Sequence, residues 1–329
     1  MENHQILAKS KLGFSASFRE AFKILFNHPN FISLVLISSF PLFASLLAHH
    51  ILLHPTFIQL LKLLSEENPS DPSPRYIIRC RLDGSTACIS QRSSDDNNFK
   101  ATLSHKFLIS TLISSALIFF LDLLSTISTV SISAAIYGGN SQMGFKQMLV
   151  EVRKRVAVRL RGSLATSLYA LILASLTLLG LIALSTNMFL MPKSSFIFGT
   201  IFVFLLTKFI EWSAIWNMGI VISILDKNHG YIAIGVAAYL SRGRRKLGLS
   251  LMLVFFALKV ALGLPCLYAL WNQGSCGALG NVVSVSFKCV GDILMWIVLM
   301  VYFYDCKRQF LEKKIDLENN GKAIEATQQ

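Results

Sequence analysis

The stretch Leu164–Leu190, LATSLYALILASLTLLGLIALSTNMFL, decides the fold of this chain because it contains no charged residue. A helix rises 1.5 Å per residue, so about 20 residues cross the roughly 30 Å of hydrocarbon in a bilayer. Five further stretches are long and apolar in the same way: Phe31–Leu53, Phe107–Tyr137, Phe196–Leu225, Leu247–Trp271 and Val282–Tyr304. A water-soluble core does not need six helices without a charged face. The sequence therefore predicts an all-α, polytopic membrane bundle of six transmembrane helices.

The composition of the whole chain agrees with a membrane protein. Hydrophobic residues make up 53% of the 329 residues and charged residues only 15%, which lies outside the usual globular mix. We expect a cytosolic N-terminal segment over residues 1–30, a transmembrane domain over 31–304 with an exofacial loop at 54–106, and a cytosolic tail over 305–329. These parts use nearly the whole length, so we expect no separate catalytic domain.

The distribution of positive charge predicts the orientation. The formal net charge is +13, and Lys and Arg concentrate in the N-terminal segment, in alternate connecting segments and in the tail. The positive-inside rule therefore places both termini in the cytosol. The segment 54–106 also carries basic residues, but they are spread out and largely balanced by Asp and Glu.

Three segments on the predicted cytosolic side have the pattern of amphipathic helices. They cover Phe14–Leu25, Phe145–Val156 and Tyr231–Leu240, and each precedes a transmembrane stretch. Such helices lie in the membrane interface. We interpret the chain as three copies of one unit, an interfacial helix followed by two spans; the alternative is that any six-span protein with basic inner loops shows this pattern.

Six charged residues lie inside the predicted spans, three of each sign. They are Asp122, Lys208, Glu211, Lys259, Lys288 and Asp292. Lys208 shares a helix face with Glu211, and Lys288 shares one with Asp292, because helical neighbours are three or four residues apart. Asp122 and Lys259 have no partner on their own helix, so we expect them to meet each other or to join the other pairs in the bundle interior.

These charges have two interpretations. They form a polar path for a small solute near the midplane, or they form buried ion pairs that fix helix packing. A stripe of hydroxyl residues beside Asp122, from Thr126 to Ser133, fits either interpretation, since hydroxyls also join helices by hydrogen bonds. The equal numbers of positive and negative residues favour ion pairs.

The predicted outer side offers two weaker candidate sites. Cys80 and Cys88 flank a turn at Asp83-Gly84 and either form a disulfide or remain free thiols. His50 and His54 are four residues apart, a spacing that can share a metal, but two histidines alone are more typical of an interface. We predict no metal site and no cofactor.

The basic clusters on the predicted cytosolic side suit contact with lipid. We name as candidate contacts for anionic headgroups Arg153, Lys154, Arg155, Arg242, Arg244 and Arg245. The alternative is that these residues only set the topology. Because the clusters lie against the membrane, nucleic acid is not an expected partner. The sequence contains no Gly-x-Ser-x-Gly, no His-Glu-x-x-His and no phosphate-binding glycine loop.

Three segments carry a resemblance to known proteins. They are Phe18–Leu25 (FREAFKIL), Glu211–Asp226 (EWSAIWNMGIVISILD) and Val301–Arg308 (VYFYDCKR). They resemble a family of uncharacterised plant proteins with six spans, over Phe14 to Arg308. More distantly, the chain is similar to the membrane domain that precedes some bacterial glycerophosphodiester phosphodiesterases, without their catalytic domain. The resemblance implies a plant source and an endomembrane or plasma-membrane location, and it transfers no activity.

The sequence favours a non-enzymatic integral membrane protein that organises membrane, lipid or partner proteins from its basic face. The competing hypothesis is a transporter or channel for a small solute that uses the charged residues at the midplane. The lipid bilayer, anionic lipids and other membrane proteins are the expected partners. The endoplasmic reticulum, other endomembranes and the plasma membrane are the expected locations.

Overall fold

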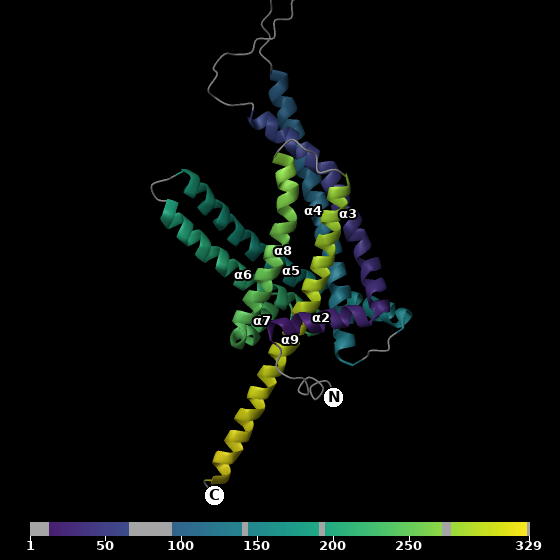
Figure 1. Cartoon of the computed structure of the whole chain (residues 1–329), viewed down its shortest axis with the longest axis vertical. Helices are drawn as coiled ribbons and strands as arrows, with labels where there is room; N and C mark the ends of the chain where they lie inside the picture. The colour runs from purple at the N-terminus through teal and green to yellow at the C-terminus, as the bar shows by residue number, and fades with distance from the viewer. Residues whose placement is uncertain (1–12, 66–93, 140–143, 191–194, 272–277, 328–329) are drawn as a thin grey trace, which may run out of the picture. The chain divides into compact units, whose positions relative to one another are not determined.

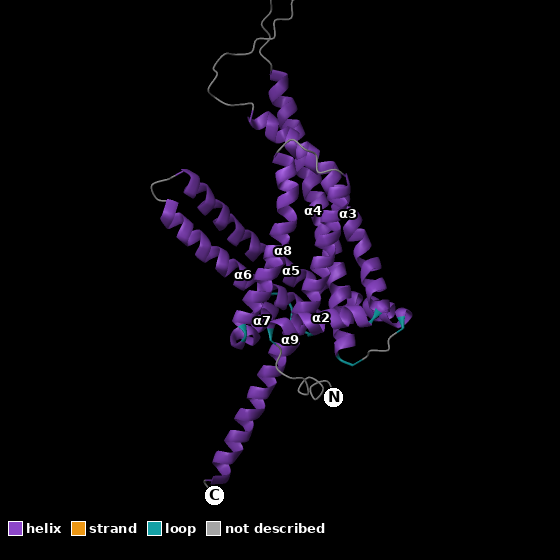
Figure 2. Ribbon diagram, viewed as in Figure 1, coloured by secondary structure: helices purple, strands orange, loops and turns teal. Residues whose placement is uncertain are grey.

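The computed structural model describes residues 13–65, 94–139, 144–190, 195–271 and 278–327, and the regular structure in these ranges is helical (Figure 2). In chain order the elements (Figure 1) are α2 (Phe14–Asn27), α3 (Pro29–Ser65), α4 (Ser94–Tyr137), α5 (Phe145–Leu190), α6 (Ser195–Leu225), α7 (Tyr231–Leu240), η2 (Ser241–Gly243), α8 (Arg245–Trp271) and α9 (Ala278–Thr327). This confirms the predicted all-α fold.

Six of the described helices are long and apolar enough to cross a membrane. The segments are Pro29–His49, Leu108–Tyr137, Phe145–Met188, Phe196–Leu225, Arg245–Gly263 and Gly280–Lys313. Each overlaps one of the six stretches predicted from the sequence. The chain thus has the architecture of a multi-pass membrane protein.

The chain divides into two compact units. The first consists of Met1–Phe43 and Leu121–Gln329, and the second of Ala44–Phe120. The boundaries fall within α3 and α4, so the second unit holds one part of each of these two helices. Its described side chains include exposed apolar residues such as Ile51, Leu112 and Ile113, as expected of helices that face lipid. The features discussed below belong to the first unit.

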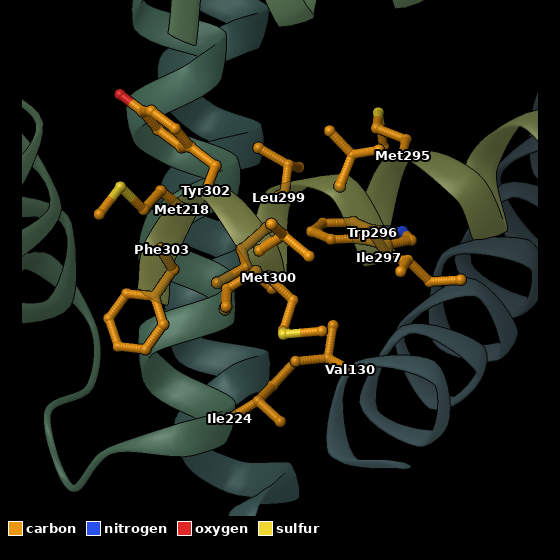
Figure 3. Close-up of a cluster of buried hydrophobic side chains, with 14 of the residues drawn as sticks. Val130, Met218, Ile224, Met295, Trp296, Ile297, Leu299, Met300, Tyr302 and Phe303 are labelled. Carbon is orange, nitrogen blue, oxygen red and sulfur yellow. The ribbon is translucent and has the colours of Figure 1, made fainter. Parts of the chain in front are cut away.

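The core of the first unit is built around α9. Every side chain from Ile297 to Phe303 is at most 1% exposed. This stretch is therefore surrounded by other helices and does not face lipid or water. Figure 3 shows Val130 from α4 and Met218 and Ile224 from α6 beside this stretch.

The helix α2 places a narrow face of small residues against this core. Ser17, Ala21 and Ile24 are its buried residues, and the Phe18 ring lies 5.7 Å from the Phe255 ring of α8. The helix ends before Pro29, as the sequence predicts. The outer side of α2 carries exposed Phe22 and Phe26 rings, which stack on each other at 5.9 Å. Large exposed aromatic rings on a surface helix suit insertion into a membrane interface.

Three boundaries differ from the sequence-based expectation. The interfacial helix expected at Phe145–Val156 is not separate but forms the first part of the continuous helix α5. The segment contains no Pro or Gly before Gly162, so nothing in it breaks the helix. In addition, α3 continues to Ser65 and α4 begins at Ser94, so both helices extend into the segment 54–106. The last helix, α9, likewise continues through most of the predicted tail.

A tight corner joins α6 to α7 and holds it against α5. Gly230 has a φ of 64°, a left-handed conformation that favours glycine. Its backbone N–H donates a 2.8 Å hydrogen bond to the hydroxyl of Thr166 in α5. The ring of His229 lies so close to Gly162 that a Cβ there would approach Nδ1 to 2.3 Å. The glycines thus allow α5 and the corner to pack at close range.

The Thr166 hydroxyl should contribute measurably to stability. In a Thr166→Val variant the buried Gly230 N–H loses its acceptor, and such a group costs about 1–3 kcal/mol. We expect a lower unfolding midpoint, measured by tryptophan fluorescence of the purified protein in detergent. Thr200→Val is the matched control, because the exposed Thr200 hydroxyl bonds only to the Phe196 carbonyl of its own helix. Equal midpoints for the two variants would contradict this account.

Candidate functional site

A network of ion pairs closes one end of the first unit. We call it the basic end. Three residues meet there: Asp226 directly after α6, Arg244 before α8, and Asp305 of α9. Lys307 Nζ lies 3.8 Å from an Asp226 carboxylate oxygen, and Arg244 lies 3.7 Å from Asp305. Arg159 of α5 donates a 2.7 Å hydrogen bond to the Asp226 carbonyl. Four helices are therefore tied together at this end.

Asp305 and Arg308 form the most deeply buried pair of this network. Their side chains are 0% and 2% exposed, and an Arg308 nitrogen lies 2.8 Å from Asp305 Oδ1. Glu312 is 3.3 Å from Arg308 Nε, one turn further along α9. The Tyr302 hydroxyl donates to the Arg244 carbonyl at 3.2 Å. Buried charges of this kind need several partners at once to be tolerated.

The sequence analysis did not single out Asp305, Arg308 or Asp226. A signal for the first two was present, because their spacing of three residues places both on one helix face directly after an uninterrupted apolar stretch. Asp226 directly follows an apolar stretch, a position that is typical of the end of a helix and indicates no site. Its partners come from α5 and α9, which are distant in sequence.

The structure separates the predicted lipid contacts into exposed and paired residues. Arg153, Lys154 and Arg242 are exposed. Arg155 instead pairs with Glu151 at 2.7 Å, and Arg244 is turned toward Asp305. Arg242 also lies over the Tyr239 ring, 5.6 Å from its centre. The residues that remain free to meet a ligand are therefore Arg153, Lys154, Arg242 and the half-exposed Arg245.

The six charges within the spans form two groups rather than one. Lys208 and Glu211 pair at 2.8 Å within α6, and Arg245, the first residue of α8, lies 3.9 Å from the other Glu211 oxygen. Lys259, further along α8, pairs with Asp292 of α9 at 2.9 Å. Arg245 and Lys259 are about 20 Å apart along α8, at 1.5 Å per residue. Lys208 and Glu211 therefore lie beside the start of α8.

The second group gathers side chains from three helices. Asp122 of α4 interacts electrostatically with Asp292, Lys259 and Lys288. The partner of Asp292 is thus Lys259 on the neighbouring helix, although Lys288 stands four residues away on the same helix. Lys288 itself is exposed and has no ion pair within 4.0 Å in the described part of the chain. The second group therefore ties α8 to α9 and leaves the Lys288 ammonium without an ion pair among the described residues.

The hydroxyl stripe of α4 continues from Asp122 into the core. Thr126 donates to the Asp122 carbonyl at 2.8 Å, and Ser133 donates to the Thr129 carbonyl at 2.6 Å. Ser125 and Ser39 of α3 share a 2.8 Å hydrogen bond between helices. The hydroxyls of Thr126, Ser128 and Ser133 are satisfied within their own helix, whereas the buried hydroxyls of Thr129 and Ser131 have no hydrogen-bond partner among the described residues.

The remaining candidates lie outside the described side chains. Cys80 and Cys88 fall within residues 66–93, and the side chains of His50 and His54 are also not described. Within the described ranges, no group of three His, Cys, Asp or Glu side chains is placed to hold a metal ion.

The Lys259–Asp292 pair should be important for stability. An Asp292→Asn variant leaves the Lys259 ammonium without its carboxylate inside an apolar span, which costs at most about 2.5–3.5 kcal/mol because this side chain is half-exposed. We expect a clearly lower unfolding midpoint, and Lys259→Met in the same chain should recover most of the loss because both charges are then gone. Glu151→Gln, which removes the pair of α5 with Arg155, should change the midpoint much less. A double variant no more stable than Asp292→Asn would refute this assignment.

Comparison with known proteins adds a family and no activity. No curated protein and no solved structure matches the chain. The plant source and the distant likeness to phosphodiesterase membrane domains therefore stay predictions. A family described as "Domain of unknown function (DUF8558)" matches residues 1–319, nearly the whole chain. The chain belongs to this uncharacterised family, DUF8558.

Proposed function

We propose that this multi-pass membrane protein binds anionic lipid headgroups at its basic end and thereby organises membrane and partner proteins without catalysis. In this proposal both termini lie in the cytosol, and the protein resides in the endoplasmic reticulum, another endomembrane or the plasma membrane. The basic end then faces the leaflet whose negative surface potential attracts Lys and Arg.

The proposal rests on the ion pairing of the acidic residues at the basic end. Asp226, Asp305, Glu151 and Glu211 each already contact a cationic side chain or lie in the ion-pair network. By contrast, Arg153, Lys154, Arg242 and Lys246 are exposed and have no ion pair within 4.0 Å among the described residues. The part of the chain that the structure describes supplies no anion within 4.0 Å of these four cations, so we propose lipid phosphates as their partners.

The helix α2 supports the same proposal. It exposes Phe22 and Phe26 together with Arg19 and Lys23. Aromatic rings beside cations are typical of helices that lie in the plane of a membrane, with the rings among the acyl chains and the cations at the phosphates. Because α2 packs against α8 and α9, its place in the membrane interface also sets the depth of these two helices in the bilayer.

The basic end should select anionic over zwitterionic lipid. We expect a variant with Arg153, Lys154, Arg242 and Lys246 all changed to Gln to lose most of this selectivity, since each cation near the surface contributes about 1 kcal/mol. The measurement is electron spin resonance of spin-labelled phosphatidylserine and phosphatidylcholine with the reconstituted full chain, read as the fraction of immobilised lipid. Selectivity should also weaken at about 1 M salt, where the Debye length falls to about 3 Å.

The control for this experiment is a variant with Lys62, Lys100 and Lys106 changed to Gln. These residues belong to the second unit and to the segment predicted to lie on the outer side. The control should keep the selectivity of the wild type. If wild-type protein shows equal association with both lipids at low salt, the proposed function is wrong.

Transport of a small cation is the second candidate, and one observation favours it. Four charged side chains from α4, α8 and α9 converge at Asp122, and Lys288 has no ion pair within 4.0 Å among the described residues. Intramembrane carboxylates are common in proton and cation paths.

Replacing Lys288 tests this candidate. Lys288→Met removes no ion pair within 4.0 Å among the described residues, so the unfolding midpoint should change little. If the group conducts, proton flux into proteoliposomes, followed with an enclosed pH-sensitive dye, should fall several-fold. Lys246→Met at the basic end serves as the control and should leave the flux unchanged. A wild-type flux equal to that of empty liposomes would eliminate transport of protons by this group.

A further inference from the structure

We infer that Lys208 of α6 and Arg245 of α8 form a discrete site for the phosphate of one anionic phospholipid. The inference rests on the proposed function, because it assumes that the basic end meets lipid headgroups. It goes further in assigning a defined site, at the crossing of α6 and α8, in addition to a diffuse basic surface.

The crossing of the two helices is close and well defined. A Cβ added at Gly248 of α8 would lie 3.4 Å from the Ala214 side chain of α6. Beside this contact, Ser213 and Asn217 approach the Met252 sulfur at 3.8 and 3.7 Å. Small residues at a crossing let the two backbones approach. The crossing thereby brings Lys208 and Glu211, one turn before Ala214, to the first turn of α8.

The charges at the crossing do not balance. Glu211 is 16% exposed and is shared between Lys208, at 2.8 Å from one oxygen, and Arg245, at 3.9 Å from the other. One carboxylate neutralises one of these two cations, and the exposed Arg242 and Lys246 add further positive charge nearby. The crossing therefore carries an excess of positive charge with no second carboxylate to offset it among the described residues.

The donors of the two cations remain available. The Arg245 nitrogen lies beyond the 3.5 Å limit of a hydrogen bond to Glu211, so its planar set of N–H groups is free for a bidentate acceptor such as phosphate. The Lys208 ammonium has three donors and uses one for Glu211. Their side chains are 39% and 49% exposed, so both can be reached from outside. Arg244 differs, because it is turned inward toward Asp305.

The surroundings favour a lipid over free phosphate. Trp212 is exposed and lies four residues from Lys208, on the same face of α6. On α8, Leu253 is exposed two turns beyond Arg245. An indole beside a cation is typical of the headgroup level of a membrane, and the apolar residue offers contact to an acyl chain. A phospholipid uses both the charged and the apolar part of this surface.

Native mass spectrometry of the purified full chain, titrated with phosphatidylglycerol or phosphatidylcholine, tests the site. We expect one phosphatidylglycerol to bind more tightly than the others, and this affinity to fall about tenfold in Lys208→Met and in Arg245→Gln. The conservative Lys208→Arg should retain it. The double variant Lys62→Gln with Lys106→Gln is the control and should also keep it, because these residues belong to the second unit and to the segment predicted to lie on the outer side.

Glu211→Gln distinguishes lipid binding by Lys208 and Arg245 from a purely structural role of these residues. Removing the shared carboxylate frees both cations, so phosphatidylglycerol should bind several-fold more tightly even if the variant is less stable. Unchanged or weaker binding by Glu211→Gln, or unchanged binding by Lys208→Met and Arg245→Gln, overturns the site. Displacement of the bound lipid by an excess of inorganic phosphate would instead identify a site for free phosphate and would also overturn the lipid assignment.

The two proposals fail in different ways. If the discrete site is absent but the basic end is functional, the spin-label selectivity for phosphatidylserine persists while the tight phosphatidylglycerol is missing in the mass spectra. If the proposed function is wrong, the wild type shows no selectivity in the spin-label experiment.

Discussion

The complete burial of α9 from Ile297 to Phe303 is the constraint on which the first unit depends. In a bilayer the hydrophobic effect does not drive helices together, because lipid tails are as apolar as Leu. A helix buried on all sides is then held by close packing and by polar contacts at its ends. The buried Asp305–Arg308 pair supplies such contacts directly after the apolar stretch, and through Arg244 it also ties in α8. Packing along α9 and ion pairing at its end are therefore parts of one arrangement.

Carboxylates in this protein are placed where they hold helices together. Lys259 and Asp292 link α8 to α9, and the Asp226 carboxylate pairs with Lys307 of α9 while its backbone carbonyl accepts from Arg159 of α5. Because charges in apolar surroundings are costly unless paired, each such pair also limits how the helices can move against each other. The cations that remain at the basic end have no such structural task. The excess of positive charge is therefore a surface property, which is the basis of the proposal that anionic lipid binds there.

The sequence predicted the elements well, whereas the contacts of charges between helices depend on packing. Long apolar stretches identify spanning helices without any knowledge of contacts, and the three-residue spacing correctly placed Lys208 beside Glu211. The contact between Glu211 and Arg245 could not be predicted, because it depends on how two helices cross. In the structure α6 crosses α8 so that Glu211 meets Arg245 at the start of that helix. Crossing geometry depends on where small residues such as Gly248 and Ala214 meet, and these come from distant parts of the sequence.

The separation of the charges into two groups bears on the choice between the two candidate functions. A path for a solute needs polar groups at successive depths, whereas about 20 Å of α8 between Lys246 and Lys259 contains only apolar residues, Gly and Ser250. The serine bonds to the carbonyl of Lys246 in its own helix and offers no continuous route. The hydroxyls of Thr126, Ser128 and Ser133 in α4 are satisfied in the same way. The group around Asp122 therefore fits ion pairing between helices better than a step in a solute path. The group around Glu211 lies beside the start of α8, where we propose that a lipid phosphate binds.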